Sequence, residues 1–353
     1  MPTGPGARLR GGFLSVTATM TPDGRIVATA LEDDVVRVVD TTRAEEFEVS
    51  ARAPAAHIEW LSVDEDGRYV LVHLLPDDDI PNFHVTISVL DVEARELLPT
   101  TLSLRPRGGW EAVTTADVTG ILTAEGDLLR LWDLSTGDLV VDNLYRAKGS
   151  VGGIVVSPDG RLAVLNNGEV VDVTTGERAA DLDIDQFDEV IGLGTMAFSA
   201  DGRWFAGSLA SGRVVVWDSR TWAAPRVWDV ASGLGVDTLV FTPDSASLIA
   251  GLAGTAAVLS LEDEGGQPVR FAVSSTRPDS RLRLGTPDGR TLVSLDESGT
   301  IREWTIDPAR LLAHACSVVA RDLTQEEWEA VLPDRPYERT CPVGAASAAP
   351  MAR

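Results

Sequence analysis

The chain has 353 residues, and its 30 lysine and arginine residues are outnumbered by 54 aspartate and glutamate residues. The formal net charge of −24 argues against nucleic acid and anionic membrane surfaces as direct partners, because both require clustered cations. No apolar stretch is long enough for a secretory signal or a membrane span. We therefore expect a cytoplasmic protein.

Short repeated segments run through most of the chain. Asp-Gly-Arg occurs five times, at residues 23–25, 66–68, 159–161, 201–203 and 288–290, and residues 242–245 form a related copy. The copies lie about 43 residues apart, with one interval of two periods. Aspartate and glycine favour tight turns, so each copy is predicted to join two strands.

A second repeated segment follows each turn, a short apolar run that closes on a polar residue or a leucine. Seven such runs end, in chain order, at Asp40, Asp91, Asp133, Asp172, Asp218, Leu261 and Thr305. Each unit thus predicts four short antiparallel strands with apolar residues on both faces. Seven such sheets stacked around an axis cover one another's faces. We predict an all-β fold, a seven-bladed β-propeller of four-stranded antiparallel blades, over residues 14–306.

Trp132-Asp133 and Trp217-Asp218 end the third strands of their units. Together with the period and the turns, they resemble the repeats of WD-repeat β-propeller proteins of bacterial type. The Gly-His pair that usually opens such a repeat is missing, so the buried Asp-His-Ser/Thr-Trp network of the family is not expected to be complete. The residues expected to build turns and blades are Asp23, Gly24, Asp66, Gly67, Trp132, Asp133, Asp159, Gly160, Asp201, Gly202, Trp217, Asp218, Asp288, Gly289 and Trp304.

The two ends of the chain are predicted to complete and extend the propeller. Residues 1–13 form an N-terminal arm that is expected to supply the closing strand of the last blade. Asp307-Pro308 predicts the start of one helix, and a capping box at 324–327 predicts a second. Residues 307–340 are therefore expected to form a helical hairpin that caps the propeller rim through Trp328, followed by a flexible tail at 341–353. The alternative is that this hairpin docks a partner.

The hairpin is similar to the C-terminal tails of actinobacterial WD-repeat proteins, many of which are the sensor ends of multidomain signal-transduction ATPases. Cys316 and Cys341 flank the hairpin. A cytoplasmic location favours reduced thiols over a disulfide at these positions.

Residues suited to catalysis or metal binding are few. His73 and His84 bracket an acidic insertion that offers metal ligands, but its composition favours an exposed loop. Asp181–Glu189 resembles the opening of a calcium loop but lacks the required glycine and final glutamate, and its alternation favours an outer strand. We expect no catalytic residue, no cofactor and no metal.

The tryptophans divide between core and surface. Trp132, Trp217 and Trp304 are expected to pack between blades, and Trp60 and Trp204 to lie in the core. Loop tryptophans and charged loops are frequent in interfaces. The candidate partner contacts are Asp77, Asp78, Asp79 and Trp222.

These observations favour a non-catalytic scaffold or sensor module that acts in signal transduction. It would bind a protein or peptide on one propeller face, and the acidic surface favours a basic partner. The alternative is a metal-dependent hydrolase or lactonase that uses the central channel. That alternative predicts histidine, aspartate and glutamate side chains converging at one mouth of the channel.

Overall fold

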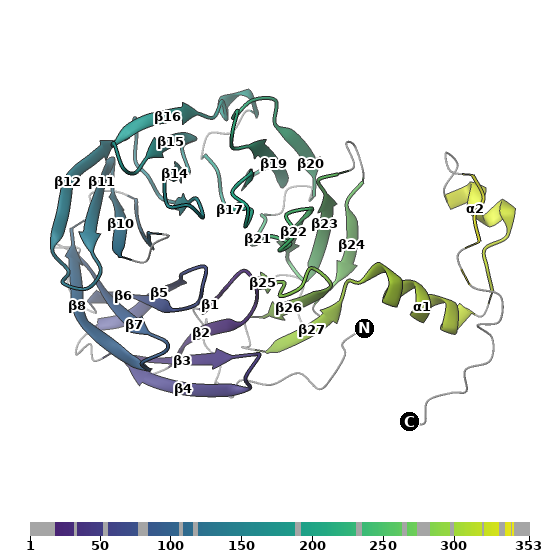
Figure 1. Ribbon diagram of the computed structural model, residues 1–353, viewed down its shortest axis with the longest axis horizontal. Coiled ribbons are helices and arrows are strands. Elements are labelled where there is room, and N and C mark those ends of the chain that lie inside the picture. Colours follow the sequence, from purple (N-terminus) through teal and green to yellow (C-terminus); the bar gives the residue numbers. More distant parts are fainter. Residues whose placement is uncertain are drawn as a thin grey trace.

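The computed structural model describes residues 18–31, 34–51, 56–76, 84–105, 109–115, 119–187, 192–230, 235–262, 267–273, 283–296, 300–319, 321–331, 336–339 and 341. Seven antiparallel sheets form a ring around a central axis (Figure 1). The predicted seven-bladed β-propeller is confirmed. No described helix is long and apolar enough to cross a membrane. The predicted closing strand at 1–13 lies outside the described residues.

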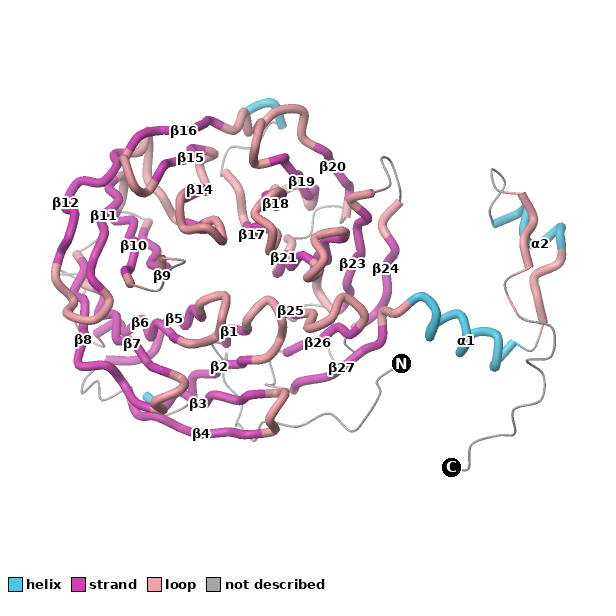
Figure 2. Tube along the Cα trace, viewed as in Figure 1, coloured by secondary structure: helices cyan, strands magenta, loops and turns pink. Residues whose placement is uncertain are grey.

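The strands follow the ring in sequence order, and each blade starts at the axis and ends at the rim (Figures 1 and 2). The strands of blades 1 to 4 are β1 (Ala18–Met20), β2 (Ile26–Leu31), β3 (Val35–Asp40), β4 (Glu45–Ser50), β5 (Ala56–Val63), β6 (Tyr69–Pro76), β7 (Val85–Asp91), β8 (Glu96–Leu104), β9 (Trp110–Thr114), β10 (Gly120–Glu125), β11 (Leu128–Asp133), β12 (Leu139–Arg146), β13 (Ile154–Val156), β14 (Leu162–Leu165), β15 (Glu169–Asp172) and β16 (Glu177–Asp181). Those of blades 5 to 7 are β17 (Met196–Phe198), β18 (Trp204–Ser208), β19 (Arg213–Asp218), β20 (Arg226–Asp229), β21 (Thr238–Phe241), β22 (Ser247–Leu252), β23 (Thr255–Ser260), β24 (Val269–Ala272), β25 (Arg283–Gly285), β26 (Thr291–Leu295) and β27 (Ile301–Thr305). Within the described residues the seventh blade has three strands.

The core lies between the blades rather than inside one layer. Each of seven hydrophobic clusters joins residues from two neighbouring blades. In β2, for example, Ala28 packs toward blade 2 while Val27 packs toward blade 7. Successive side chains of a strand point to opposite faces, so each sheet contributes to two clusters. This explains why the third strands are continuous apolar runs.

The ring closes where blade 7 meets blade 1. The Thr286 amide donates a hydrogen bond to the Pro22 carbonyl at 2.7 Å. At Gly285 a Cβ atom would lie 2.5 Å from the backbone nitrogen of Gly24 and 2.6 Å from its Cα. Only glycine lets the two backbones approach this closely.

We expect Gly285→Ala to lower the free energy of unfolding by about 2 kcal/mol, because the added methyl group meets backbone atoms that cannot move aside. Gly235→Ala is the matched control, since a Cβ there has no neighbour within 4 Å. Urea unfolding of both variants checks this. Equal stability of the two variants would show that the seam is loose.

The two predicted C-terminal helices are present, as α1 (Pro308–Val319) and α2 (Gln325–Val331). The prediction that they cap the rim is wrong, because α1 leads away from the ring and α2 lies beyond it (Figure 1). Trp328 is buried at 6% exposure, and its ring lies edge-on to that of Tyr337 at 5.8 Å. The appendage therefore has a small core of its own.

The expectation of reduced cysteines is also wrong. Cys316, on α1, and Cys341 form a disulfide across 25 residues, with Cα atoms 5.5 Å apart. The chain folds back after α2, and this return brings the second cysteine beside the first.

Two further sequence expectations need correction. The segment predicted as an outer strand from Asp181 leaves β16 at once and enters a short 3₁₀ helix, η2 (Asp185–Phe187). Its apolar residues are buried, as the alternation indicated, but they fold inward rather than extend a strand. Trp60, expected in the core, is 38% exposed and lies under the Arg283 guanidinium. Trp204 is buried as expected.

Candidate functional site

The Asp-Gly-Arg turns share one hydrogen-bond pattern. In blade 1 the Asp23 carboxylate accepts hydrogen bonds from the Thr21 hydroxyl and from the Arg25 amide, while the Ile26 amide donates to the Thr21 hydroxyl oxygen. Gly24 has a φ of 72°, a conformation that favours glycine. The turns of blades 4 and 5 repeat these bonds. All turns of this kind lie at one end of the propeller, which we call the turn face.

The arginine of the turn has a partner that the sequence patterns did not reveal. In blades 1, 2, 4 and 5 it forms an ion pair with the aspartate that ends the third strand of the same blade. The pairs and their N–O distances are Arg25–Asp40 at 3.4 Å, Arg68–Asp91 at 4.0 Å, Arg161–Asp172 at 3.1 Å and Arg203–Asp218 at 3.6 Å. The two repeated sequence segments are thus two halves of one contact on the turn face.

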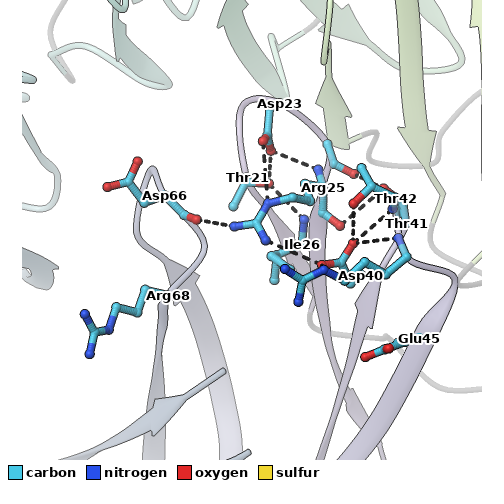
Figure 3. Close-up of polar contacts among 12 residues, drawn as sticks. Thr21, Asp23, Arg25, Ile26, Asp40, Thr41, Thr42, Glu45, Asp66 and Arg68 are labelled. Atoms are coloured by element: carbon cyan, nitrogen blue, oxygen red, sulfur yellow. Dashed lines mark hydrogen bonds and ion pairs between the residues drawn. The ribbon is translucent and has the colours of Figure 1, made fainter. Parts of the chain in front are cut away.

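Arg25 also connects blade 1 to blade 2. Figure 3 shows its guanidinium between the Asp40 carboxylate and the backbone carbonyl of Asp66, to which Nη2 donates a hydrogen bond. Asp66 belongs to the turn between β5 and β6, whose Gly67 amide donates to the Asp64 carbonyl at 3.1 Å. Arg25 therefore holds the position of this turn from the neighbouring blade.

A cleft between blades 1 and 2 lies beside this contact, but its charges cancel. Its lining contains four arginines, Arg25, Arg43, Arg68 and Arg95, and four acidic residues, Asp40, Glu45, Asp66 and Glu93. Arg95 pairs with Glu45 across the blade boundary. The cleft therefore joins the blades and offers no excess charge to a ligand.

A larger cavity, of about 420 Å³, opens on the turn face at the mouth of the central channel. Turns and inner strands of blades 2 to 5 form its wall. The lining residues are Ser62, Val63, Asp64, Glu65, Asp66, Leu71, Val113, Thr114, Thr115, Ile154, Val155, Val156, Ser157, Pro158 and Ala200. Three of these are acidic and none is basic, so the mouth has a strongly negative potential.

The acidic residues come from the turn of blade 2, where two carboxyls replace the first two residues of the blade 1 turn. Blade 1 reads Thr-Pro-Asp-Gly-Arg, whereas blade 2 reads Asp-Glu-Asp-Gly-Arg. Asp64 occupies the threonine position, and its Oδ1 accepts from the amides of Arg68 and Tyr69 at 2.7 and 3.1 Å. A hydroxyl oxygen fills this role in other blades. The turn itself therefore uses one acceptor oxygen at position 64 and needs no carboxyl at position 65, where blade 1 has Pro22.

The surroundings raise the pKa of two of these carboxyls. Asp64 is 8% exposed, and its Oδ2 has no hydrogen-bond partner among the described residues. Burial raises the pKa of Asp64 above its ordinary value, although the turn amides oppose the shift. Glu65 is exposed at the surface of the mouth, yet desolvation by the surrounding protein, followed by the charges of Asp66 and Asp64, raises its pKa to about 6. Negative charge is therefore unfavourable at these carboxyls, and a cation at the mouth would stabilise it.

His73 lies behind this wall, between blades 2 and 3. It is fully buried, its Nε2 is 3.2 Å from the Ser62 hydroxyl, and its ring centroid is 5.2 Å from that of Trp110. Burial lowers the pKa of His73 to about 3. A histidine this weakly basic is a poor general base for Ser62 at neutral pH.

Within the part of the chain that the structure describes, the residues that the hydrolase alternative requires do not come together. None of the four histidines lines the cavity, and the three carboxylates come from a single turn. Among the described residues no group of three histidine, cysteine, aspartate or glutamate side chains is arranged to hold a metal ion.

The sequence-predicted contact residues have different locations. Asp77, Asp78 and Asp79 lie outside the described residues. Trp222 has a φ of 55° in a turn after β19, and its ring packs on Phe198 and Phe205 at 6.4 and 5.9 Å. It is partly buried at the edge of a core cluster, so packing accounts for much of its surface. The site residues Asp64 and Glu65 were missed, although their departure from the repeat was visible in the sequence.

Two tryptophan indoles form hydrogen bonds within their blades. The indole of Trp132 donates to the Thr123 hydroxyl at 2.9 Å, and that of Trp304 donates to the Ser294 hydroxyl at 2.8 Å. Both bonds join the third strand to the second within a blade. Trp217 is buried, has no such bond among the described residues, and packs on Phe205.

Comparison with known proteins supports the fold. No protein-family model and no curated protein matches the chain. Among solved structures, 1513 chains match. One is a chain from the crystal structure of a mitotic checkpoint complex, with a TM-score of 0.63 and 16% sequence identity over 87% of this chain and 92% of that chain. At this identity the likeness shows the propeller fold alone.

Proposed function

We propose that this protein is a non-catalytic interaction module that binds a protein or peptide on its turn face, at the acidic mouth of the channel. The observation that carries the proposal is the 420 Å³ cavity, whose wall comes from four blades and contains three acidic and no basic residues. A rigid ring presents such a surface without a cost in ordering it. The net charge of −24 favours a basic partner.

Site-specific photo-crosslinking in the native host tests this proposal. Ala200 lines the mouth on the turn face, and Ala210 lies at the other end of β18, on the opposite face. Both are exposed. With p-benzoylphenylalanine at one position or the other, we expect a discrete protein crosslinked at position 200 and absent at position 210. Equal yields at the two positions would contradict binding on the turn face.

The electrostatic part of the proposal has its own measurement. Raising the salt concentration from 0.05 to 0.5 M shortens the Debye length to a few ångströms, so it should reduce the crosslinked yield at position 200 several-fold. A yield that does not change with salt would show that the partner is not chosen by its charge.

We also propose that the chain is the sensor part of a bacterial signal-transduction system, detached from or supplied to a signalling ATPase. The similarity of its C-terminal segment to the tails of such proteins supports this. An ATPase reading frame adjacent or fused to this one in related genomes is the expected finding. Consistent absence of such a frame would contradict it.

A further inference from the structure

The C-terminal appendage, formed by α1 and α2, concentrates the exposed apolar surface of the molecule. Ten large apolar side chains are exposed among the described residues, and five of them lie in the appendage: Leu311, Leu312, Val318, Leu323 and Tyr337. Apolar side chains that gather in one exposed place mark interaction surfaces, whereas scattered ones do not. Because α1 leads away from the ring, the propeller does not cover these residues (Figure 1).

On α1 the exposed apolar residues form one continuous stripe. Leu311, Leu312, Ala315 and Val318 are exposed and lie within about 120° of the helix circumference, because successive residues are about 100° apart. We call these four residues the α1 stripe. It contains no charged side chain, and the only arginine of the helix, Arg310, lies on the opposite side. A helix of 12 residues is marginal in water unless another surface covers its apolar side.

The α1 stripe is symmetric about Ala315. Leu312 lies three residues before Ala315 and Val318 three residues after it. When two such helices pair antiparallel around a twofold axis at Ala315, each Leu312 faces the Val318 of the other copy. The small alanine side chains at the centre let the two helix backbones approach closely. A surface that fits a copy of itself in this way is characteristic of a twofold interface.

Charge favours the antiparallel arrangement over the parallel one. α2 contains Glu326, Glu327 and Glu329 and no basic residue, and it lies at the C-terminal end of α1 (Figure 1). Parallel pairing would bring two acidic α2 helices to the same end of the pair. Antiparallel pairing places each α2 near the N-terminal end of the other α1, where Arg310 and Asp307 form an ion pair and balance each other.

The acidic propellers do not prevent this contact. α1 leads away from the ring, so two copies can join their helices without bringing the propellers together (Figure 1). At physiological ionic strength, exposed charges more than about 8 Å apart are largely screened. The dipoles of two antiparallel helices also attract each other.

We propose that the α1 stripe binds the same stripe of a second copy of this chain, and that the two helices pair antiparallel about Ala315. The contact is small, because α1 is only about 18 Å long and buries less than the roughly 800 Å² per partner of a standard interface. The dimer is therefore reversible, with a dissociation constant on the order of 10–100 µM. This inference is independent of the function proposed for the channel mouth.

Sedimentation equilibrium of the full chain, with its disulfide intact, tests the proposal. The weight-average mass should rise from 37.6 kDa toward twice that value as the concentration rises from about 2 to about 500 µM. Leu312→Glu places a carboxylate against the Val318 of the other copy and should raise the dissociation constant at least tenfold. A mass of 37.6 kDa at every concentration would overturn the proposal.

Ala313→Glu is the matched control for that variant. It introduces the same charge at an exposed position on the side of α1 that faces away from the α1 stripe, so it should leave the dissociation constant nearly unchanged. A dimer that survives Leu312→Glu as well as Ala313→Glu would place the interface elsewhere on the molecule and refute the assignment.

Mixing two variants tests the antiparallel pairing itself. Val318→Lys alone should weaken the dimer at least tenfold, as Leu312→Glu does. In an equimolar mixture of the two variants, the introduced carboxylate of one copy faces the introduced ammonium of the other, and the native Leu312 and Val318 face each other. The mixture should therefore regain at least tenfold in affinity over either variant alone. Such a gain requires that both variants fold, and a mixture that stays monomeric would contradict the pairing.

A different occupant of the α1 stripe is recognised by crosslinking in the native host. With p-benzoylphenylalanine in place of Leu311, we expect a crosslinked product that contains two copies of this chain and no other protein. A crosslink to a different protein, without the product of two copies, would show that the α1 stripe docks that protein, and the proposal would fail.

Discussion

Replacing Glu111 with glutamine should raise the free energy of unfolding by about 3 kcal/mol at pH 8.5 and leave it nearly unchanged at pH 4. Glu111 lies on β9, the inner strand of blade 3, and is partly buried. Burial raises the pKa of Glu111 to about 7, although the Ala112 amide donates a hydrogen bond to its carboxyl.

The sign of the effect follows from the pH at which Glu111 ionises in the folded and in the unfolded chain. Below about pH 4.5 the carboxyl is protonated in both the folded and the unfolded chain, so it makes no difference to stability. Between pH 4.5 and 7 the unfolded chain ionises first, and the folded state loses relative stability as the pH rises. Above pH 7 the carboxyl is ionised in both states, and the folded protein bears the full free-energy cost of the buried charge. Glutamine is always neutral, so the substitution removes this cost.

Urea unfolding followed by tryptophan fluorescence at both pH values checks this result. Glu96→Gln, at an exposed position on β8, is the control and should shift stability by less than about 0.5 kcal/mol at either pH. A gain for Glu111→Gln that is the same at pH 4 and pH 8.5 would mean that the change acts through packing rather than through charge.

Loss of the disulfide should unfold the C-terminal appendage while leaving the propeller folded. Closing a loop of 25 residues stabilises the appendage by about 3.5 kcal/mol relative to its open form. Its few buried side chains, among them Cys316 and Trp328, cannot replace that contribution. The capping box and the Arg321–Glu327 ion pair are exposed and add little.

Hydrogen exchange read by mass spectrometry measures this effect segment by segment. In the variant Cys316→Ser/Cys341→Ser, the amides of α2 should lose their protection, while peptides from the blades should exchange as in the oxidised protein. Ser317→Ala, at an exposed neighbour on α1, is the control. Unchanged protection of α2 without the disulfide would show that the appendage folds by its own packing.

Some of the candidate site was visible in the sequence. Asp66 and Gly67 belong to a turn that the repeat predicted, and the departure at Asp64 and Glu65 stood in the same five residues. What the sequence did not contain was the location of this turn beside blades 3 to 5. The cavity exists because residues from four blades meet around one axis.

The amino-acid sequence alone determined the number of blades, the four-stranded unit and the turn positions. These features are local, because strand alternation and the φ of a turn glycine depend on residues next to one another. Only the tertiary structure decided the pairing of Arg25 with the Asp66 carbonyl, the exposure of Trp60, the disulfide and the acidic mouth. Each of these depends on groups that are distant in the chain and meet only after the blades have packed into a ring.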